Sequence, residues 1–179
     1  CSLMERVYLD HAATTPLDPE VLEVMKPYLL EEYGNASSVH QLGRQARVAM
    51  EEARGRVAEC IGAEPSEIVF TSGGTEADNL ALKGTLRDAS SPEHPAGLIT
   101  SAAEHEGVLR PAERLAEQGH PVGILTPEAH GAVTPAQVDA AVDDRTALVS
   151  LMHTNNEIGV QTDIPAVAEV CRRHDVLLH

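Results

Sequence analysis

The stretch of sequence that decides the fold is residues 68–79, which read IVFTSGGTEADN. Its first three residues are apolar and predict a buried strand, and two glycines then lead into a helix. Glycines let a backbone come close to a ligand, and a helix start offers free amides with positive dipole character. The pattern therefore predicts a phosphate-binding turn at Gly74 and Thr75. A second interpretation stays open, a capped helix with Thr75 as N-cap and Asp78 completing a capping box.

Outward from this stretch, short apolar segments alternate with amphipathic ones along the chain. The pattern predicts strands at residues 7–9, 68–70, 98–100, 122–125, 147–152 and 176–179. It predicts helices at residues 19–33, 42–61, 75–87, 107–118, 135–142 and 164–174. Strands that alternate with helices indicate an α/β fold, a mainly parallel sheet with helices on both faces. In such sheets the ligand lies at the carboxyl ends of the strands.

Composition limits the classes of function. Apolar residues make up 42% of the 179 residues, enough for a core, and the formal charge of −15 argues against nucleic acid or an anionic membrane as partner. No apolar run approaches the roughly 18 residues that span a bilayer. Cys60 and Cys171 fall in predicted helices without a close pair, which favours packing roles and a reduced, cytoplasmic compartment.

Two more polar segments follow predicted strands. His105 could stack its flat ring on a planar cofactor or move a proton, although a solvated loop histidine is the plainer interpretation. The carboxylates beside it suggest a metal, but no second ligand motif supports one, so no metal site is predicted. The Asn155-Asn156 pair could form a turn, or offer an amide that binds a phenolate-like oxygen. Three strand ends that share one edge support a common site.

At these residues the chain resembles the cysteine desulfurases, in the class V aminotransferase branch of the pyridoxal-phosphate fold type I enzymes. The motifs that carry the resemblance run in order along nearly the whole chain: YLDHAATTP at 8–16, YGN at 33–35, EIVFTSGGTE at 67–76, EH at 104–105 and MHTNNEIG at 152–159. The resemblance implies that the chain forms the large-domain part of the aspartate-aminotransferase-like architecture. It also implies pyridoxal 5′-phosphate as the cofactor.

The resemblance assigns a role to several residues. Gly74 and Thr75 would hold the cofactor phosphate, His105 would stack on the ring and assist proton transfers, and Asn156 would bond the phenolic oxygen. Four residues would lie near the substrate entrance and the subunit interface: His11, Ala13, Asn35 and His40. The implied activity converts L-cysteine to L-alanine and an enzyme-bound persulfide, a sulfur supply for iron–sulfur clusters. The implied partners are a second copy in a homodimer and a sulfur-acceptor or scaffold protein.

The chain departs from the family in its lysines and cysteines. Its lysines, Lys26 and Lys83, match no Schiff-base motif, and neither Cys60 nor Cys171 resembles the persulfide cysteine. We therefore expect the N-terminal portion of a longer enzyme, incomplete at its C-terminus, inactive alone and binding cofactor weakly without a covalent bond. The expected parts are a cloning remnant at 1–3, an N-terminal segment at 4–20 and a partial cofactor-binding large domain at 21–179. Alternatives are another class V enzyme such as a selenocysteine lyase, and a non-catalytic binding or dimerisation module.

Overall fold

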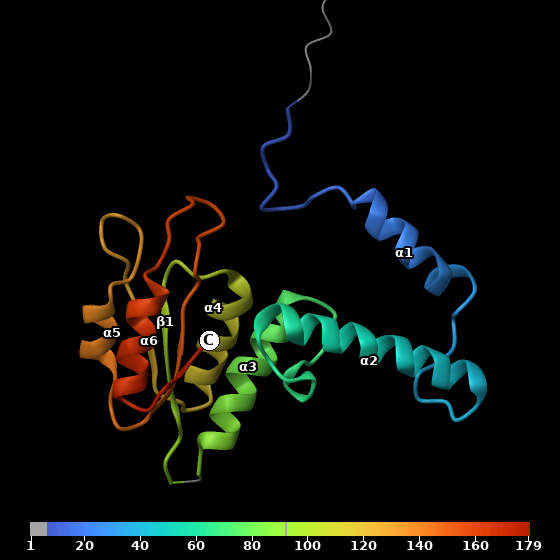
Figure 1. Cartoon of the computed structure of the whole chain (residues 1–179). Helices are drawn as coiled ribbons and strands as arrows, with labels where there is room; N and C mark the ends of the chain where they lie inside the picture. Colours follow the sequence, from blue (N-terminus) through green and yellow to red (C-terminus); the bar gives the residue numbers. More distant parts are fainter. Residues whose placement is uncertain (1–6, 92) are drawn as a thin grey trace, which may run out of the picture. The chain divides into compact units, whose positions relative to one another are not determined.

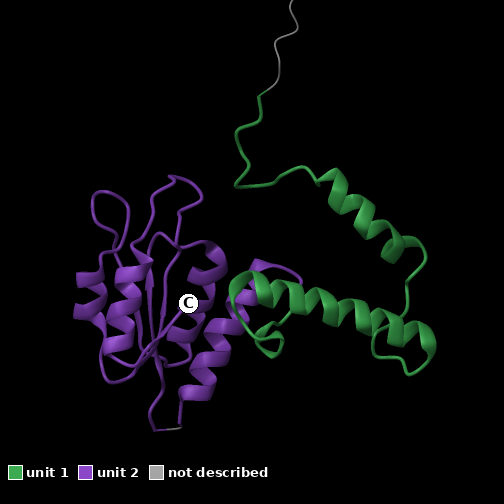
Figure 2. Cartoon of the chain, in the orientation of Figure 1, with its two compact units in different colours: residues 1–70 green, residues 71–179 purple. Residues whose placement is uncertain are grey.

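The computed structural model describes residues 7–91 and 93–179, which form two compact units. Unit 1 ends at Phe70 and unit 2 runs from Thr71 to His179 (Figure 2). The predicted remnant at residues 1–3 lies outside the described residues. The predicted boundary at residue 20 stays a prediction.

Unit 2 is built on a four-stranded parallel sheet with the strand order β2-β1-β3-β4 (Figure 1). The strands are β1 (Gly97–Ser101), β2 (Val122–Leu125), β3 (Thr146–Ser150) and β4 (Leu177–Leu178). The chain leaves β1 for β2 on one side, and then returns to place β3 on the other side of β1. The order therefore reverses between β1 and β3, the point at which open α/β sheets bind ligands beyond their carboxyl ends.

Helices cover both faces of this sheet, as the sequence predicts: α3 (Gly74–Ala89), α4 (Glu106–Glu117), α5 (Pro135–Ala141) and α6 (Ile164–Arg173). Successive strand residues face opposite sides, so Leu98 packs with α3 and α4, whereas Ile99 packs with α5 and α6. Leu148 and Val149 divide in the same way on β3. Two apolar layers therefore hold the sheet between two pairs of helices.

Local capping chemistry explains where the helices of unit 2 begin. Thr134 accepts from the Gln137 amide while the Gln137 side chain accepts from the Thr134 amide, a reciprocal capping box at the start of α5. The Asp163 carboxylate accepts from the Ala166 amide at the start of α6. The predicted bounds of these helices are confirmed to within a residue.

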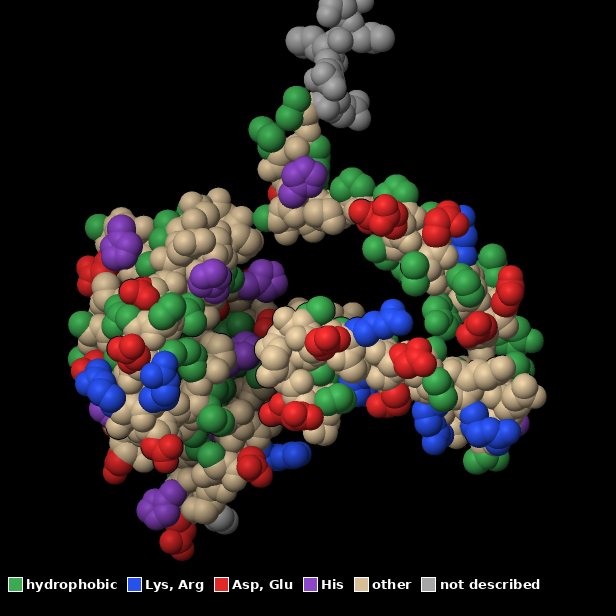
Figure 3. Space-filling model, in the orientation of Figure 1, with side chains coloured by type: hydrophobic (Ala, Val, Ile, Leu, Met, Phe, Trp, Pro, Cys, Tyr) green, Lys and Arg blue, Asp and Glu red, His purple; other side chains and the backbone are tan. Residues whose placement is uncertain are grey.

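Unit 1 contains α1 (Pro19–Leu30), α2 (Gln41–Ile61) and a short 3-10 helix, η1 (Pro65–Glu67). Gly62 ends α2 in the left-handed conformation (φ +68°) that favours glycine. The apolar side chains along α1 are exposed, and the space-filling view shows several of them on the surface (Figure 3). Among the described residues, no helix is both long and apolar enough to cross a membrane.

Two predicted strands in unit 1 are wrong. Residues 7–9 and 68–70 do not pair with any described strand, although Ile68 has an extended backbone (φ −93°, ψ 125°). A strand needs a neighbour for its amides and carbonyls, whereas the Ile68 carbonyl accepts from the Arg54 guanidinium instead. The same guanidinium lies 4.9 Å from the centre of the Phe70 ring. The apolar pattern at residues 68–70 therefore agrees with the extended backbone of Ile68 but does not predict the pairing.

Candidate functional site

The start of α3 presents free backbone amides. Gly73 is its N-cap and no side chain of the described residues caps it, so the capping box with Thr75 as N-cap and Asp78 as partner is wrong. The first intrahelical bond runs from the Ala77 amide to the Gly73 carbonyl. The three amides before Ala77 remain available at the positive end of the helix dipole. This is the geometry that an anion requires.

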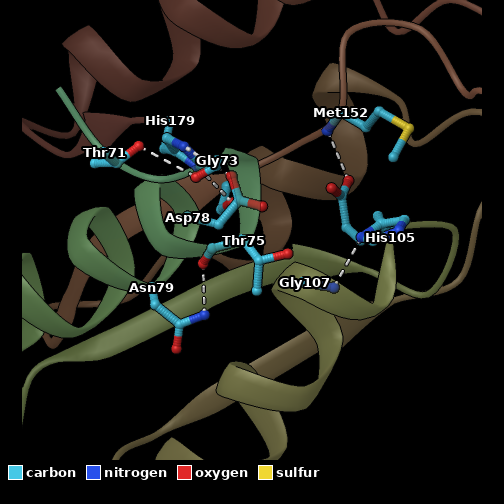
Figure 4. A network of polar contacts seen from close by, with 11 residues as sticks. Thr71, Gly73, Thr75, Asp78, Asn79, His105, Gly107, Met152 and His179 are labelled. Atoms are coloured by element: carbon cyan, nitrogen blue, oxygen red, sulfur yellow. Dashed lines mark hydrogen bonds and ion pairs between the residues drawn. The ribbon is translucent and has the colours of Figure 1, made fainter. Parts of the chain in front are cut away.

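Neither glycine of this turn is explained by packing within the protein. A side-chain carbon built on Gly73 or Gly74 would meet no atom within 4 Å, and neither residue has a positive φ that would demand glycine. Thr71 donates its hydroxyl to the Gly73 carbonyl at 3.1 Å and fixes the turn from the other side (Figure 4). The open space above the amides therefore suits a group that approaches the backbone closely, as a phosphate does.

Glu76 ties the residues before α3 to its first turn. Its carboxylate accepts from the Ser72 amide at 2.7 Å and from the Ser72 hydroxyl at 2.5 Å. These two bonds hold the pKa of the exposed Glu76 carboxyl below its usual range. A carboxylate in the first turn also stabilises the helix start.

His105 begins α4 and caps it with its own ring. The ring Nδ1 accepts from the Gly107 amide at 2.9 Å, so Nδ1 carries a lone pair and the neutral ring carries its proton on Nε2 (Figure 4). Gly107 lets the start of α4 approach α3, because a side-chain carbon there would lie 3.1 Å from Asp78 Oδ2 and 3.5 Å from Thr75 Oγ1. The structure thus brings the predicted residues Thr75 and His105 together.

This cap gives the first testable prediction. Because a lost N-cap costs about 1 kcal/mol, His105→Ala should lower the free energy of unfolding by about that much. His105→Asn should restore the loss, since asparagine is a favoured N-cap. Urea denaturation measures both, with His130→Ala as the control because His130 is an exposed loop histidine. Equal stability of the alanine variant and the original protein would rule out the cap.

Two side chains connect the loops that follow β1 and β3. The Glu104 carboxylate accepts from the Met152 amide at 2.6 Å, and the Asn155 side-chain amide donates to the Ala103 carbonyl at 3.0 Å. The Asn155 side-chain oxygen accepts from two amides of its own loop, those of Glu157 and Ile158. Asn155 therefore forms the turn that is the plainer role for paired asparagines, and it also joins the two loops.

Asn156 differs from its neighbour. Its side chain is exposed and makes no hydrogen bond within the described part of the chain. An amide without an internal partner can bind a ligand oxygen, and Asn155 holds the loop in which it lies. The structure is thus compatible with the role that the resemblance gives to Asn156.

A polar chain links α3 to the ends of β3 and β4. Asp78 Oδ1 lies 3.8 Å from His179 Nε2, and His179 Nδ1 lies 2.9 Å from the Ser150 hydroxyl. Ser150 is 1% exposed, so this constellation is no nucleophilic triad, because a substrate cannot reach the hydroxyl. These polar contacts instead order the strand ends, since the Leu151 amide also donates to the His179 carbonyl. Nothing in the sequence pattern predicts these contacts.

Two hollows meet at His105. One, of about 430 Å³, lies between α3 and α4 and includes Thr75 and Asn79 in its lining. The other, of about 240 Å³, lies at the carboxyl edge of the sheet and includes Glu104 and Met152. His105 lines both, so its ring lies between the anion-binding turn and the loops of the strand ends.

Burial raises the pKa of the Glu104 carboxyl. Loss of water raises the pKa of this half-buried carboxyl, the Met152 amide lowers it, and the negative charge of Asp78 raises it further, with a net rise. A carboxyl whose folded pKa is raised contributes stability below its unfolded pKa and loses that contribution as the pH rises through the folded value. Ionisation of Glu104 therefore costs stability.

Glu104→Gln tests this cost. Glutamine keeps an oxygen for the Met152 amide without the charge, so the variant should exceed the original protein in unfolding free energy at pH 7. The difference should shrink as the pH falls to the usual range of a carboxyl, where Glu104 is protonated. Urea denaturation between pH 4 and pH 8 measures it. A constant difference across this range would contradict the shift.

The four residues predicted for the substrate entrance belong to unit 1, where three have local roles. The His11 ring meets the Tyr8 ring edge to face at 5.0 Å, and the Asn35 side-chain oxygen Oδ1 accepts from the Ser37 amide at 2.8 Å. His40 caps α2 by accepting from the Gly43 amide at 3.3 Å. Ala13, the fourth residue, lies in a turn and donates its amide to the Asp10 carbonyl at 3.1 Å. The role of all four residues at a substrate entrance stays a prediction.

The two cysteines of the described helices differ in burial. Cys171 is buried in α6, and burial raises the pKa of its thiol, whereas Cys60 is exposed, so the packing role predicted for Cys60 is wrong. Cys60 falls on the solvent side of α2, a distinction that helical periodicity alone does not settle for small residues. Within residues 7–91 and 93–179, no three histidine, cysteine or carboxylate side chains cluster to hold a metal ion.

Known proteins are similar to this chain in sequence and in fold. The chain is 44% identical over 178 residues to cysteine desulfurase IscS of Dictyoglomus turgidum, covering 99% of the chain and 44% of that protein. It is 49% identical over 177 residues to cysteine desulfurase IscS of Ectopseudomonas mendocina, covering 97% of the chain and 43% of that protein. The chain thus spans less than half the length of these curated relatives.

Solved structures agree. A NifS-like protein superposes with a TM-score of 0.91 at 37% identity, covering 98% of this chain and 48% of that one. A structure of SspA in complex with cysteine superposes with a TM-score of 0.89 at 39% identity, covering 96% and 49%. These neighbours bear out the predicted α/β architecture of fold type I. The model of the aminotransferase class-V family matches residues 7–179. The chain belongs to that family.

Proposed function

We propose that this chain is the cofactor-binding part of a cysteine desulfurase that uses pyridoxal 5′-phosphate. The observation that carries the proposal is the meeting of a free helix start, Thr75 and the His105 ring within unit 2. The relatives named as cysteine desulfurases match this part of the chain, and they support the same activity.

The residues present fit the cofactor. The amides of Gly74 and Thr75, together with the Thr75 hydroxyl, would hold the phosphate at the positive end of α3. The His105 ring would lie against the pyridine ring, with its Nε2 proton free to be donated because Nδ1 is held by the Gly107 amide. Asn156 would donate its amide to the phenolic oxygen. When bound, the cofactor supplies an electron sink for the bonds around the substrate's α-carbon.

The proposed reaction converts L-cysteine and a protein thiol to L-alanine and a protein persulfide. Cys171 is unsuited to accept the sulfur, because it is buried and its thiol pKa is raised. The chain's lysines lie in α1 and α3, and Lys83 faces the hollow between α3 and α4. The Schiff-base lysine and the sulfur-accepting cysteine would come from outside these 179 residues.

The remaining parts of the proposal concern the enzyme as a whole. It would act as a homodimer in the cytoplasm and pass its sulfur to an acceptor or scaffold protein for iron–sulfur clusters. His11, Ala13, Asn35 and His40 would lie near its substrate entrance. The three expected segments, 1–3, 4–20 and 21–179, would be a remnant, an N-terminal segment and the large domain.

Assay of the full-length protein that carries this chain tests the function. We expect the purified protein to show the near-visible absorbance of bound pyridoxal phosphate and to form alanine and sulfide from L-cysteine with a reductant. Selenocysteine serves as the competing substrate, since a selenocysteine lyase would prefer it. A protein that binds the cofactor but leaves L-cysteine unchanged would contradict the proposed activity.

A further inference from the structure

The loops after β1 and β3 flank the point where the strand order reverses. One loop carries His105 and the other carries Asn156, the two side chains proposed to contact the cofactor ring. Both loops begin after the last residue of their strand, Ser101 in β1 and Ser150 in β3. Backbone pairing of the sheet therefore does not fix how far the two side chains lie from each other.

Two hydrogen bonds cross between these loops, and each loop supplies one of the two side chains. The loop after β1 supplies an acceptor side chain, Glu104, to the Met152 amide, and the loop after β3 supplies a donor side chain, Asn155, to the Ala103 carbonyl. The Glu104 bond is the shorter of the two, at 2.6 Å against 3.0 Å. Each loop thus holds the other.

Glu104 immediately precedes His105, and this adjacency gives the bond its consequence. Its carboxylate bonds to the Met152 amide one residue before His105. The Gly107 amide holds the His105 ring itself (Figure 4). A ring whose backbone and side chain are both held loses little conformational freedom when a ligand binds. Asp78 and His179 also face the hollow in which Glu104 lies, and neither hydrogen-bonds to it.

We propose that Glu104 is a positioning residue that locks the His105 loop to the Asn155–Asn156 loop, so that ring and amide reach one cofactor together. The inference rests on the proposed function for its ligand. The lock itself depends on the reach of the side chain to the Met152 amide, not on its charge. A side chain too short to reach the Met152 amide should therefore weaken the binding of pyridoxal phosphate. The affinity of the phosphate-binding turn for inorganic phosphate should stay unchanged.

Two conservative variants of the full-length protein separate reach from charge. Glu104→Gln keeps the reach and removes the charge, and Glu104→Asp keeps the charge and shortens the side chain. We expect Glu104→Asp to raise the Kd of pyridoxal phosphate about tenfold, while the Kd of inorganic phosphate stays within about twofold. Glu104→Gln should bind both ligands nearly as the original protein does. Glu169→Ala is the control, because Glu169 is an exposed carboxylate on α6.

Hydrogen exchange of the Met152 amide tests the lock without any cofactor. The exchange rate should rise about tenfold in Glu104→Asp and stay close to the original in Glu104→Gln and Glu169→Ala. Unchanged exchange in Glu104→Asp would overturn the proposal, as would loss of ring affinity in Glu104→Gln with retention in Glu104→Asp. If the original protein fails to bind pyridoxal phosphate, the proposed function fails, while the exchange measurement still decides whether the lock exists.

Discussion

Leu86→Ala is expected to lower the free energy of unfolding of the chain by about 3 kcal/mol, the middle of the range for a buried leucine. Leu86 is fully buried in α3 and packs with Leu98 and Leu148 of the two central strands. Truncation of this side chain loses the free energy of burying it and leaves a cavity, which the packed side chains of the helix and the sheet cannot close. Denaturation by urea, followed by circular dichroism, measures the change.

Leu80→Ala is the matched control, since Leu80 lies in the same helix and is 52% exposed. Its truncation should change the unfolding free energy by no more than about 0.5 kcal/mol. The two variants remove the same atoms from one helix and differ only in burial. Similar losses for both would contradict the packing of α3 against the sheet.

Sequence periodicity predicts the elements of unit 2 because their local signals and their packing agree. Residues 98–100 and 147–152 are apolar on both sides, as central strands covered by helices must be, and the structure places β1 and β3 there. Residues 68–70 have the same local signal but no partner within the described chain. Pairing is a long-range property, and a local pattern cannot supply it.

The candidate site was predictable where the type of a residue and its place in the chain suggest ligand contact, and unpredictable where a residue acts through another one. Glycines before a helix and a histidine after a strand both suggest ligand contact. The Glu104–Met152 bond joins residues 48 positions apart, so no window of sequence contains it. The only sequence signal at Glu104 is a carboxylate beside His105, which can suggest a metal site. Among the described residues, no three possible metal ligands cluster there.

The anion-binding turn gives the prediction with the largest effect on binding. Gly74→Asp should raise the Kd of pyridoxal phosphate about a hundredfold in the full-length protein, about 2.7 kcal/mol. The new carboxylate would stand at the first residue of α3, where the structure leaves open space and where the phosphate dianion is proposed to bind. Two negative charges at one helix start repel each other and compete for the same amides.

The same substitution should leave the fold intact, and this separates binding from stability. An aspartate in the first turn favours the helix dipole, so the unfolding free energy should stay unchanged or rise by up to about 0.5 kcal/mol. Gly84→Asp, further along α3 and also without a neighbour within 4 Å of its added carbon, is the control, and its Kd should stay within about threefold. Fluorescence titration with pyridoxal phosphate measures both variants. If Gly74→Asp binds as tightly as Gly84→Asp, the phosphate does not lie at the start of α3, and the proposed cofactor site loses its anchor.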